Sequence, residues 1–330
     1  MADTAAVAKA DPVASTGLRW PDFFIVGAPR CATTFLYASL RRHDRVFMPA
    51  RKEQRFFCPD LDSAGAGWGG GRGTRSVDDV NAYLAQFADA RPDQLIGEAT
   101  ATYLFSAAAA AEIQAVTPDA RILISLRDPV GQMRSFHALR HATGREPLEF
   151  EAALADEAER LPGGQADRPV NFAGGERLMP YRAVASYAEQ VRRYFDRFGR
   201  DRTLILLYEE VTRQPQAAMD QLCEFLGIDP IAPAPAAVNT GYRVRSRRLM
   251  LLTRRLALFE PARRVAPAWL RRRLRGTREV VRRLNADVTA APTRQPTPVE
   301  LRDRLRAEMR PDVERLSELL GRDMAAYWWG

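Results

Sequence analysis

Short, largely apolar runs of strand length recur along the chain, and several end at loop residues such as Gly27, Pro29 and Pro129. Runs of this kind are typical of strands that are buried on both faces of a parallel sheet. The pattern predicts strands over residues 23–26, 95–98, 121–126 and 203–208.

Segments with helical pattern separate these runs. The clearest lies over residues 181–198, where apolar and aromatic side chains recur at helical spacing on one face. Strands that alternate with helices predict an α/β fold, in which a parallel sheet is flanked by helices on both faces. The other helices are expected from Thr33 onward, over 78–88 and 106–116, after Pro129, and over 219–226.

The two ends of the chain differ in composition from its middle. Residues 1–19 are small and polar and are expected to form a flexible N-terminal tail. Residues 20–330 are expected to form a single domain, in which 243–330 is an arginine-rich helical extension. Trp328 and Trp329, next to the C-terminus, are expected to dock this extension onto the core.

The charge of the chain favours anionic ligands. The formal net charge is +8, and 49 basic residues include only two lysines, of which Lys52 is one. In the basic run at 243–283, arginines alternate with apolar residues, which favours amphipathic helices with a solvated basic face. Binding of an anionic polysaccharide or of a lipid headgroup is the alternative. No nucleic acid partner is expected. Three widely spaced cysteines, no signal-peptide pattern and no run of about 18 apolar residues favour a cytoplasmic protein without a membrane span, and peripheral membrane contact stays open.

The first candidate site is the loop from Gly27 to Thr34, between the first strand and the first helix. Backbone N–H groups at a helix N-terminus favour an anion, and neighbouring side chains add hydroxyls and charge. The loop lacks the GxxxxGK[ST] pattern of a Walker A motif. The alternative is a capped helix start with a surface arginine. The anion-binding residues would be Arg30, Cys31, Ala32, Thr33 and Thr34.

Two further candidates follow along the chain. Lys52 and Glu53 form a neighbouring cation and carboxylate, which elsewhere is most often a surface ion pair. Arg127 ends the third predicted strand and Ser135 lies about two helical turns later, so both side chains can converge on one phosphate. A salt-bridged Arg127 beside an incidental Ser135 is the alternative.

In this order and spacing, the three motifs resemble those of sulfotransferases that use 3′-phosphoadenosine 5′-phosphosulfate (PAPS), in the bacterial and heparan-sulfate branch. The resemblance covers about residues 21–245. It implies a P-loop-like sulfotransferase fold and an in-line transfer of the sulfuryl group to a hydroxyl or amine of a carbohydrate, lipid or small molecule. Adenosine 3′,5′-bisphosphate (PAP) would be the product, and no metal is expected. The oligomeric state is not specified by the sequence.

The resemblance also implies roles for the motif residues. The first loop would bind the 5′-phosphate, Lys52 would lie near the sulfuryl group, Glu53 would be the general base, and Arg127 with Ser135 would bind the 3′-phosphate. The chain departs from the family where Arg30 replaces Lys, Ala32 replaces Gly and Arg55 replaces His. Arg30 keeps the charge of that Lys, with a wider, planar head group, and is the third catalytic candidate beside Lys52 and Glu53. Glu98 is expected to be structural. Weaker candidates for the nucleotide site are Tyr208, Arg243, Arg245 and Arg247.

Two other functions are weighed against this one. A P-loop-like kinase would use ATP, but the missing GK[ST] and the Arg127–Ser135 pair count against it. A non-catalytic basic anion-binding protein would bind the bisphosphate without turnover. His43, His137 and His141 lack the spacing of a metal site.

Overall fold

The computed structural model describes residues 18–61, 80–142, 145–160, 170–171, 177–235, 243–244, 286–287 and 297–330. The predicted N-terminal tail is therefore almost wholly outside the described residues. Arg245, Arg247 and most of the basic run at 243–283 are outside them as well.

Within the described residues, the main sheet has five strands in the order β2-β3-β1-β4-β7, and every neighbouring pair is parallel. The chain passes from β3 to β4 across β1, which lies at the centre. The four predicted strands are confirmed, and β2 is an addition. The strands are β1 (Phe23–Gly27), β2 (Val46–Phe47), β3 (Leu95–Ala99), β4 (Arg121–Leu126) and β7 (Thr203–Leu207).

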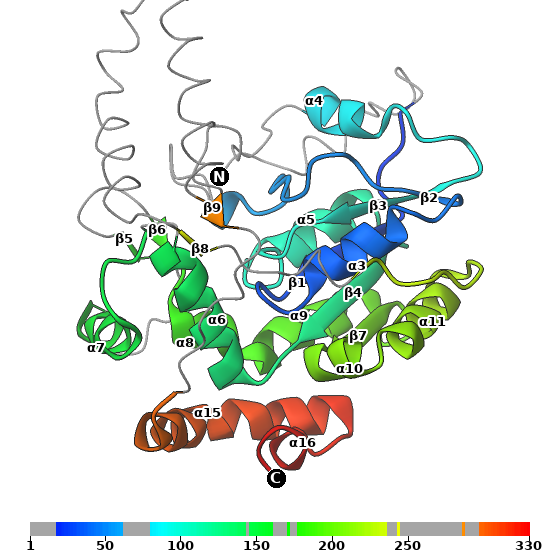
Figure 1. Cartoon of the computed structure of the whole chain (residues 1–330). Helices are drawn as coiled ribbons and strands as arrows, with labels where there is room; N and C mark the ends of the chain where they lie inside the picture. Colours follow the sequence, from blue (N-terminus) through cyan, green and yellow to red (C-terminus); the bar gives the residue numbers. More distant parts are fainter. Residues whose placement is uncertain are drawn as a thin grey trace, which may run out of the picture.

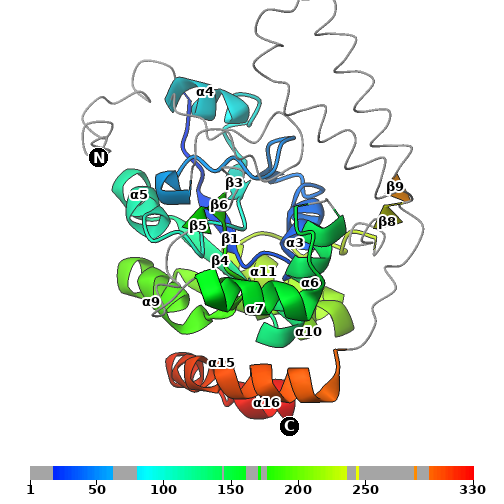
Figure 2. The same ribbon diagram turned by 90° about the vertical axis from the view of Figure 1, so that its left-hand side faces the viewer.

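Helices cover both faces of this sheet (Figures 1 and 2), which confirms the predicted α/β class. Alternate side chains of one strand serve the two faces. Phe24 and Val26 join a core with residues of α5 (Ala109–Val116) and α9 (Tyr187–Phe198). Phe23 and Ile25 join a second core with residues of α3 (Thr33–Leu40) and α11 (Pro215–Leu226).

The remaining elements surround this sheet. They include α4 (Val80–Leu84) with the 3-10 helix η2 (Ala85–Phe87), and another 3-10 helix, η1 (Pro59–Leu61). Two short antiparallel pairs are formed by β5 (Val170–Asn171) with β6 (Arg177–Leu178), and by β8 (Arg243–Val244) with β9 (Ala286–Asp287). The other helices are α6 (Pro129–Ala142), α7 (Phe150–Arg160), α8 (Tyr181–Ala185), α10 (Tyr208–Arg213), α15 (Val299–Leu320) and α16 (Met324–Trp329).

The predicted helix over 181–198 is wrong at one point, because Ser186 divides it into α8 and α9. Ser186 has φ −86° and ψ 94°, outside the helical region. The Asp312 carboxylate, on α15, accepts the backbone N–H groups of Tyr187 (2.6 Å) and Ala188 (3.3 Å). A carboxylate that binds the first N–H groups of a helix stabilises a start there, so a tertiary contact sets the boundary.

Two C-terminal helices close the described fold below the sheet (Figure 1). The α15 helix buries Leu305, Val313 and Leu316 in the core that contains α9. The predicted docking of the C-terminus is confirmed, because Trp328 and Trp329 are partly buried against that core. Among the described residues, no helix is long and apolar enough to cross a membrane.

Candidate active site

The candidate site gathers at the carboxyl ends of the parallel strands, where ligands bind in open α/β sheets. Gly27, the last residue of β1, lies against the segment after β3, because an added Cβ there would be 2.5 Å from Cβ of Leu104. Arg30 (φ 68°) and Ala32 (φ 65°) then take the left-handed conformation that glycine adopts most easily. Ala32 is the N-cap residue of α3, so the loop leads directly into the N-terminus of that helix.

The side chains of this loop point in different directions. Cys31 is fully buried, and burial raises the pKa of its thiol to about 12. Its Sγ donates to the Pro29 carbonyl (3.6 Å) and its backbone N–H to the Ala28 carbonyl (3.2 Å), so Cys31 holds the loop in shape. Thr34 is exposed, whereas Arg30 is partly exposed.

Lys52 joins the loop after β2 to the start of α3. Its ammonium donates to Oγ1 of Thr33 (2.9 Å) and of Thr34 (3.2 Å), and it forms an ion pair with Oε1 of Glu53 at 3.3 Å. The Lys52 side chain is only 16% exposed, so Lys52 and Glu53 do not form the solvated surface ion pair that is the common alternative for such neighbours. Burial lowers the pKa of Lys52, and the Glu53 carboxylate opposes that shift.

Glu53 is held against the loop that follows β3. Its backbone N–H donates to the Ala99 carbonyl (2.9 Å), and its Oε2 accepts the N–H of Ala101 (3.1 Å). The side chain keeps 28% exposure, so one edge of the carboxylate can reach an acceptor. Glu53 also has a left-handed backbone, with φ 63°.

Glu98 lies beneath this arrangement and has no exposure to solvent. Its carboxyl accepts the hydroxyls of Thr100 (2.6 Å), Tyr83 (2.7 Å) and Tyr103 (3.1 Å). Burial raises the pKa of Glu98 to about 7. These contacts support the structural role expected for Glu98. Arg55 is also buried (1% exposed), and its Nη2 donates to the Leu61 carbonyl.

The first and third motifs meet in space. Nε of Arg30 donates to Oγ of Ser135, on α6, at 3.1 Å across 105 residues of sequence. Nε2 of Gln132, one turn earlier on α6, donates to the Pro29 carbonyl at 3.1 Å. The loop after β1 and the first turns of α6 therefore form one surface.

Arg127, at the end of β4, lies over the ring of Tyr208, with Cζ 4.1 Å from the ring centroid. Tyr208 opens α10, so the predicted strand over 203–208 is one residue too long. Within the described part of the chain, Arg127 forms no ion pair. The neighbouring Asp128 instead holds the turn, because its Oδ2 accepts the N–H of Gly131 at 2.9 Å.

The comparisons with known proteins agree with this geometry. A family model described as "Sulfotransferase family" matches residues 21–233, which is more than half of the chain. The chain belongs to the sulfotransferase family.

Among solved structures, the chain is similar to a sulfotransferase from Alicyclobacillus acidocaldarius, with 30% identity and a TM-score of 0.66. That match covers 94% of this chain and 99% of the other. Among curated proteins it is similar to carbohydrate sulfotransferase 15 of Homo sapiens (24% identity over 260 residues) and of Rattus norvegicus (23% over 257). Both matches cover 67% of this chain and 46% of the relative, so the chain spans about half the length of these relatives.

Three of the expected nucleotide-site arginines have side chains that the structure does not describe. Arg243 lies in β8, and its side chain is not described; Arg245 and Arg247 lie outside the described residues. His137 and His141 both contact the Leu148 carbonyl, and the described residues include no group of three or more metal-ligating side chains.

Two features of the site were not predicted. Gln132 faces the first loop, and the two C-terminal tryptophans reach the residues beside Arg127 and Tyr208. The position of Gln132, one turn into the helix that Pro129 opens, was a usable signal. Nothing in the local sequence links Trp329 to a residue 201 positions away.

Proposed function

We propose that this sulfotransferase transfers the sulfuryl group of PAPS to an acceptor hydroxyl by in-line displacement. The observation that carries the proposal is the hydrogen bond between Arg30 and Ser135. It joins the loop suited to a 5′-phosphosulfate to the helix suited to a 3′-phosphate, so one nucleotide with phosphates at both ends can span the two elements.

The donor site is built from charge and backbone. Thr33, Thr34 and the first turn of α3 would hold the 5′-phosphosulfate, with Ala32 contributing its backbone N–H group. The N–H of Cys31 donates to the Ala28 carbonyl (3.2 Å), so Cys31 would shape the loop. Arg127 and Ser135 would bind the 3′-phosphate, and Tyr208 would support Arg127 from below. These residues fit an anionic nucleotide, because the guanidinium of Arg127 has no ion-pair partner among the described carboxylates. When bound, PAPS supplies an activated sulfuryl group.

Lys52 and Glu53 would carry the chemistry. Sulfuryl transfer resembles phosphoryl transfer, in which charge is spread over the equatorial and leaving oxygens of a loose transition state. The ammonium of Lys52, held at Thr33 and Thr34, would stabilise that charge. Glu53 would take the acceptor proton. Arg30 adds a second cation at the same loop.

We propose a carbohydrate as the acceptor. The support is the similarity to proteins named carbohydrate sulfotransferase 15, which is distant. The net charge of +8 is compatible with an anionic polysaccharide. A lipid hydroxyl, a small-molecule hydroxyl and an amine are alternative acceptors and belong in the same assay.

The donor is tested first by thermal unfolding with adenosine 3′,5′-bisphosphate or with ATP and Mg²⁺. A ligand that binds the native state stabilises it by about 2.7 kcal/mol at 100 times its dissociation constant. We expect the bisphosphate to raise the melting temperature and ATP–Mg²⁺ to leave it nearly unchanged. The opposite result would favour the kinase.

Transfer is tested with ³⁵S-labelled PAPS and a panel of neutral and anionic carbohydrates, lipids and amines. Labelled carbohydrate supports the proposal, and label in another class of acceptor would replace that part of it. If the bisphosphate binds but no acceptor is labelled, the result favours the alternative function, a non-catalytic anion-binding protein.

A further inference from the structure

Two carboxylates flank the proposed 3′-phosphate site. Asp128 directly follows Arg127, and Glu209 directly follows Tyr208, whose ring lies under the Arg127 guanidinium. An added Cβ at Gly131 would lie 3.1 Å from both Nε of Arg127 and Oδ2 of Asp128. The guanidinium and the carboxylate are therefore neighbours, although they do not form an ion pair.

All four oxygens of these carboxylates accept an N–H group. Oδ2 of Asp128 binds the N–H of Gly131 (2.9 Å), and Oε1 of Glu209 binds the N–H of Asp128 (3.2 Å). The other two oxygens bind indoles from the C-terminus: Nε1 of Trp329 donates to Oδ1 of Asp128 (2.8 Å), and Nε1 of Trp328 donates to Oε2 of Glu209 (3.2 Å).

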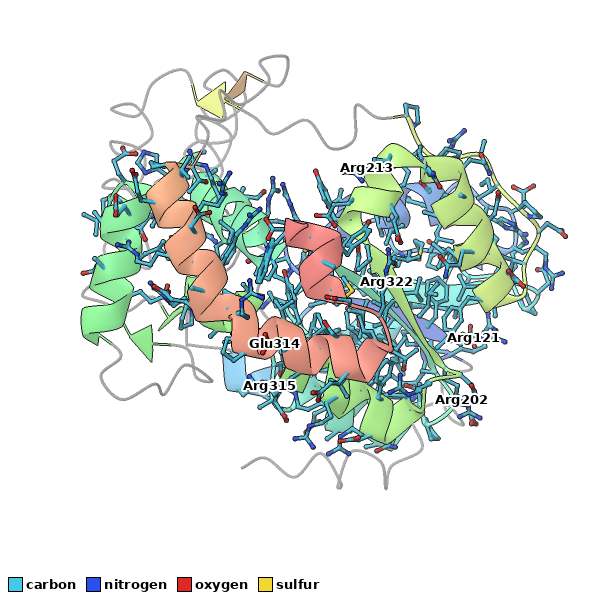
Figure 3. All side chains as sticks on the ribbon, turned by 90° about the horizontal axis from the view of Figure 1, so that it is seen from below. Arg121, Arg202, Arg213, Glu314, Arg315 and Arg322 are labelled. Carbon is cyan, nitrogen blue, oxygen red and sulfur yellow. The ribbon has the colours of Figure 1, made fainter. Side chains whose placement is uncertain are left out.

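The helix that carries these indoles is anchored independently. Seen from below, α16 lies between α15 and α10 (Figure 3). Arg322, just before α16, forms an ion pair with Glu210 at 2.8 Å and lies over the ring of Tyr327. Arg306 and Arg310 of α15 approach the ring of Trp329 at 5.9 and 5.7 Å from its centroid. The indoles are thus presented to Asp128 and Glu209 at defined positions.

This arrangement affects how Arg127 can bind an anion. An arginine next to a free carboxylate forms a charge-assisted, often bidentate pair, and a phosphate would have to displace it. The oxygens of Asp128 and Glu209 accept indole and backbone N–H groups instead of the Arg127 guanidinium, so the guanidinium can bind a phosphate.

We propose that Trp328 and Trp329 are positioning residues of the donor site, which hold Glu209 and Asp128 away from Arg127 and so keep it free for the 3′-phosphate. This inference rests on the proposed function. It assigns to the C-terminal helix a part in nucleotide recognition, in addition to packing.

The test compares Trp328→Phe, Trp329→Phe and the double variant with the wild type. Phenylalanine keeps an aromatic ring but removes the N–H donor. Tyr327→Phe is the matched control on the same helix, because the contact of its ring with Arg322 is retained. Dissociation constants are measured by calorimetry for adenosine 3′,5′-bisphosphate and for adenosine 5′-monophosphate, which lacks the 3′-phosphate, and thermal unfolding without ligand reports the packing.

We expect the double variant to bind the bisphosphate about tenfold or more weakly, as loss of a charge-assisted contact would produce. Its affinity for the monophosphate should change less than about twofold, since that ligand does not use Arg127. Adding Asp128→Asn to Trp329→Phe should restore most of the bisphosphate affinity lost in Trp329→Phe. A neutral amide cannot pair with Arg127 as a carboxylate does, while its oxygen can still accept the N–H of Gly131.

Equal losses for both nucleotides, or no rescue by Asp128→Asn, would reduce the tryptophans to packing residues and overturn the inference. Unchanged bisphosphate affinity in the double variant would also overturn it. After any of these results, PAPS would remain the proposed donor, provided the wild type binds the bisphosphate more tightly than the monophosphate. A wild type that does not discriminate between the two nucleotides would overturn the donor assignment and, with it, this inference.

Discussion

At the scale of single residues, the backbone of Ala32 departs from what its side chain favours. A left-handed conformation costs a residue with a Cβ roughly 1–2 kcal/mol, and the cost is absent in glycine. The family pattern places Gly at this position, and the φ of 65° explains why. The loop therefore has a left-handed backbone at Ala32, although alanine disfavours it.

We expect Ala32→Gly to raise the free energy of unfolding by about 0.5–1 kcal/mol, because relief of strain exceeds the entropy that glycine adds to the unfolded chain. Urea unfolding measures it. Ala38→Gly, within the same helix α3, is the control and should lower stability by about 0.5–1 kcal/mol. Destabilisation by both substitutions would mean that the loop does not favour glycine.

Glu53 is the residue on which the proposed chemistry depends most directly. We expect Glu53→Gln to reduce the rate of sulfuryl transfer at least about 100-fold, because a positioned general base contributes that much or more. Bisphosphate affinity should stay within about threefold, since the amide oxygen can still accept the N–H of Ala101 and the change costs well under 1 kcal/mol of donor binding. Transfer at the wild-type rate would remove Glu53 from the mechanism.

At the scale of elements, buried polar side chains join segments that are not adjacent in sequence. The carboxylate of Asp312, on α15, accepts the first backbone N–H of α9. The carboxyl of Glu98, on β3, accepts the hydroxyl of Tyr83, on α4. Such contacts combine burial with directed hydrogen bonds, so removing one partner leaves the other unsatisfied.

Glu98 should give the protein an unusual dependence of stability on pH. Its pKa is about 7 in the folded protein, above the ordinary 4.5, so the folded state binds more protons between these values. Stability contributed by this group is present below pH 4.5 and is lost as the pH rises to about 7.

The measurement is urea unfolding of wild type and Glu98→Gln across pH 4.5–8. The wild type should lose stability relative to the variant up to about pH 7, with a constant difference above it. Glu224→Gln, an exposed carboxylate on α11, is the control. A difference that is the same at every pH would mean that Glu98 titrates normally.

The α15 helix should contribute strongly to stability, because it covers the core next to α9. Leu305 is fully buried, so Leu305→Ala is expected to lower the free energy of unfolding by about 2–5 kcal/mol. Val299 is 58% exposed on the same helix, and Val299→Ala should change stability by less than about 0.5 kcal/mol. Similar effects of the two substitutions would show that α15 is not an integral part of the core.

At the scale of the whole molecule, parallel strands bring the ends of β1, β3, β4 and β7 to one edge of the sheet. Residues that are far apart in sequence, such as Arg30 and Ser135, contact each other there. The formal net charge of the chain is +8, and a net positive charge favours the approach of anions over long range.

This net charge predicts how the reaction of an anionic carbohydrate acceptor would respond to salt. Its kcat/KM should fall as NaCl rises from about 0.05 to 0.5 M, because the screening length shrinks across that range. A neutral carbohydrate acceptor, assayed with the same PAPS concentration held saturating, is the control and should respond much less. Equal salt dependence would locate the effect at the donor instead.

Most strands of the sheet and the three motifs could be predicted from local patterns along the chain. A buried strand needs a continuous apolar run, and a loop before a helix needs particular residues, so β1, β3, β4 and the motifs around Arg30, Lys52 and Arg127 could be predicted. Two predicted boundaries were wrong, because the apolar pattern continues past the end of the element. The strand ends before Tyr208, and the predicted helix is divided at Ser186.

Local patterns did not predict which of these residues contact each other. The contact of Arg30 with Ser135, the burial of Glu98 and the reach of Trp329 to Asp128 join positions that no local pattern relates. Their physical cause is the packing of helices on a parallel sheet, which brings distant segments within hydrogen-bonding distance. Periodicity along a chain reports burial on an element, but it carries no information about which element lies opposite.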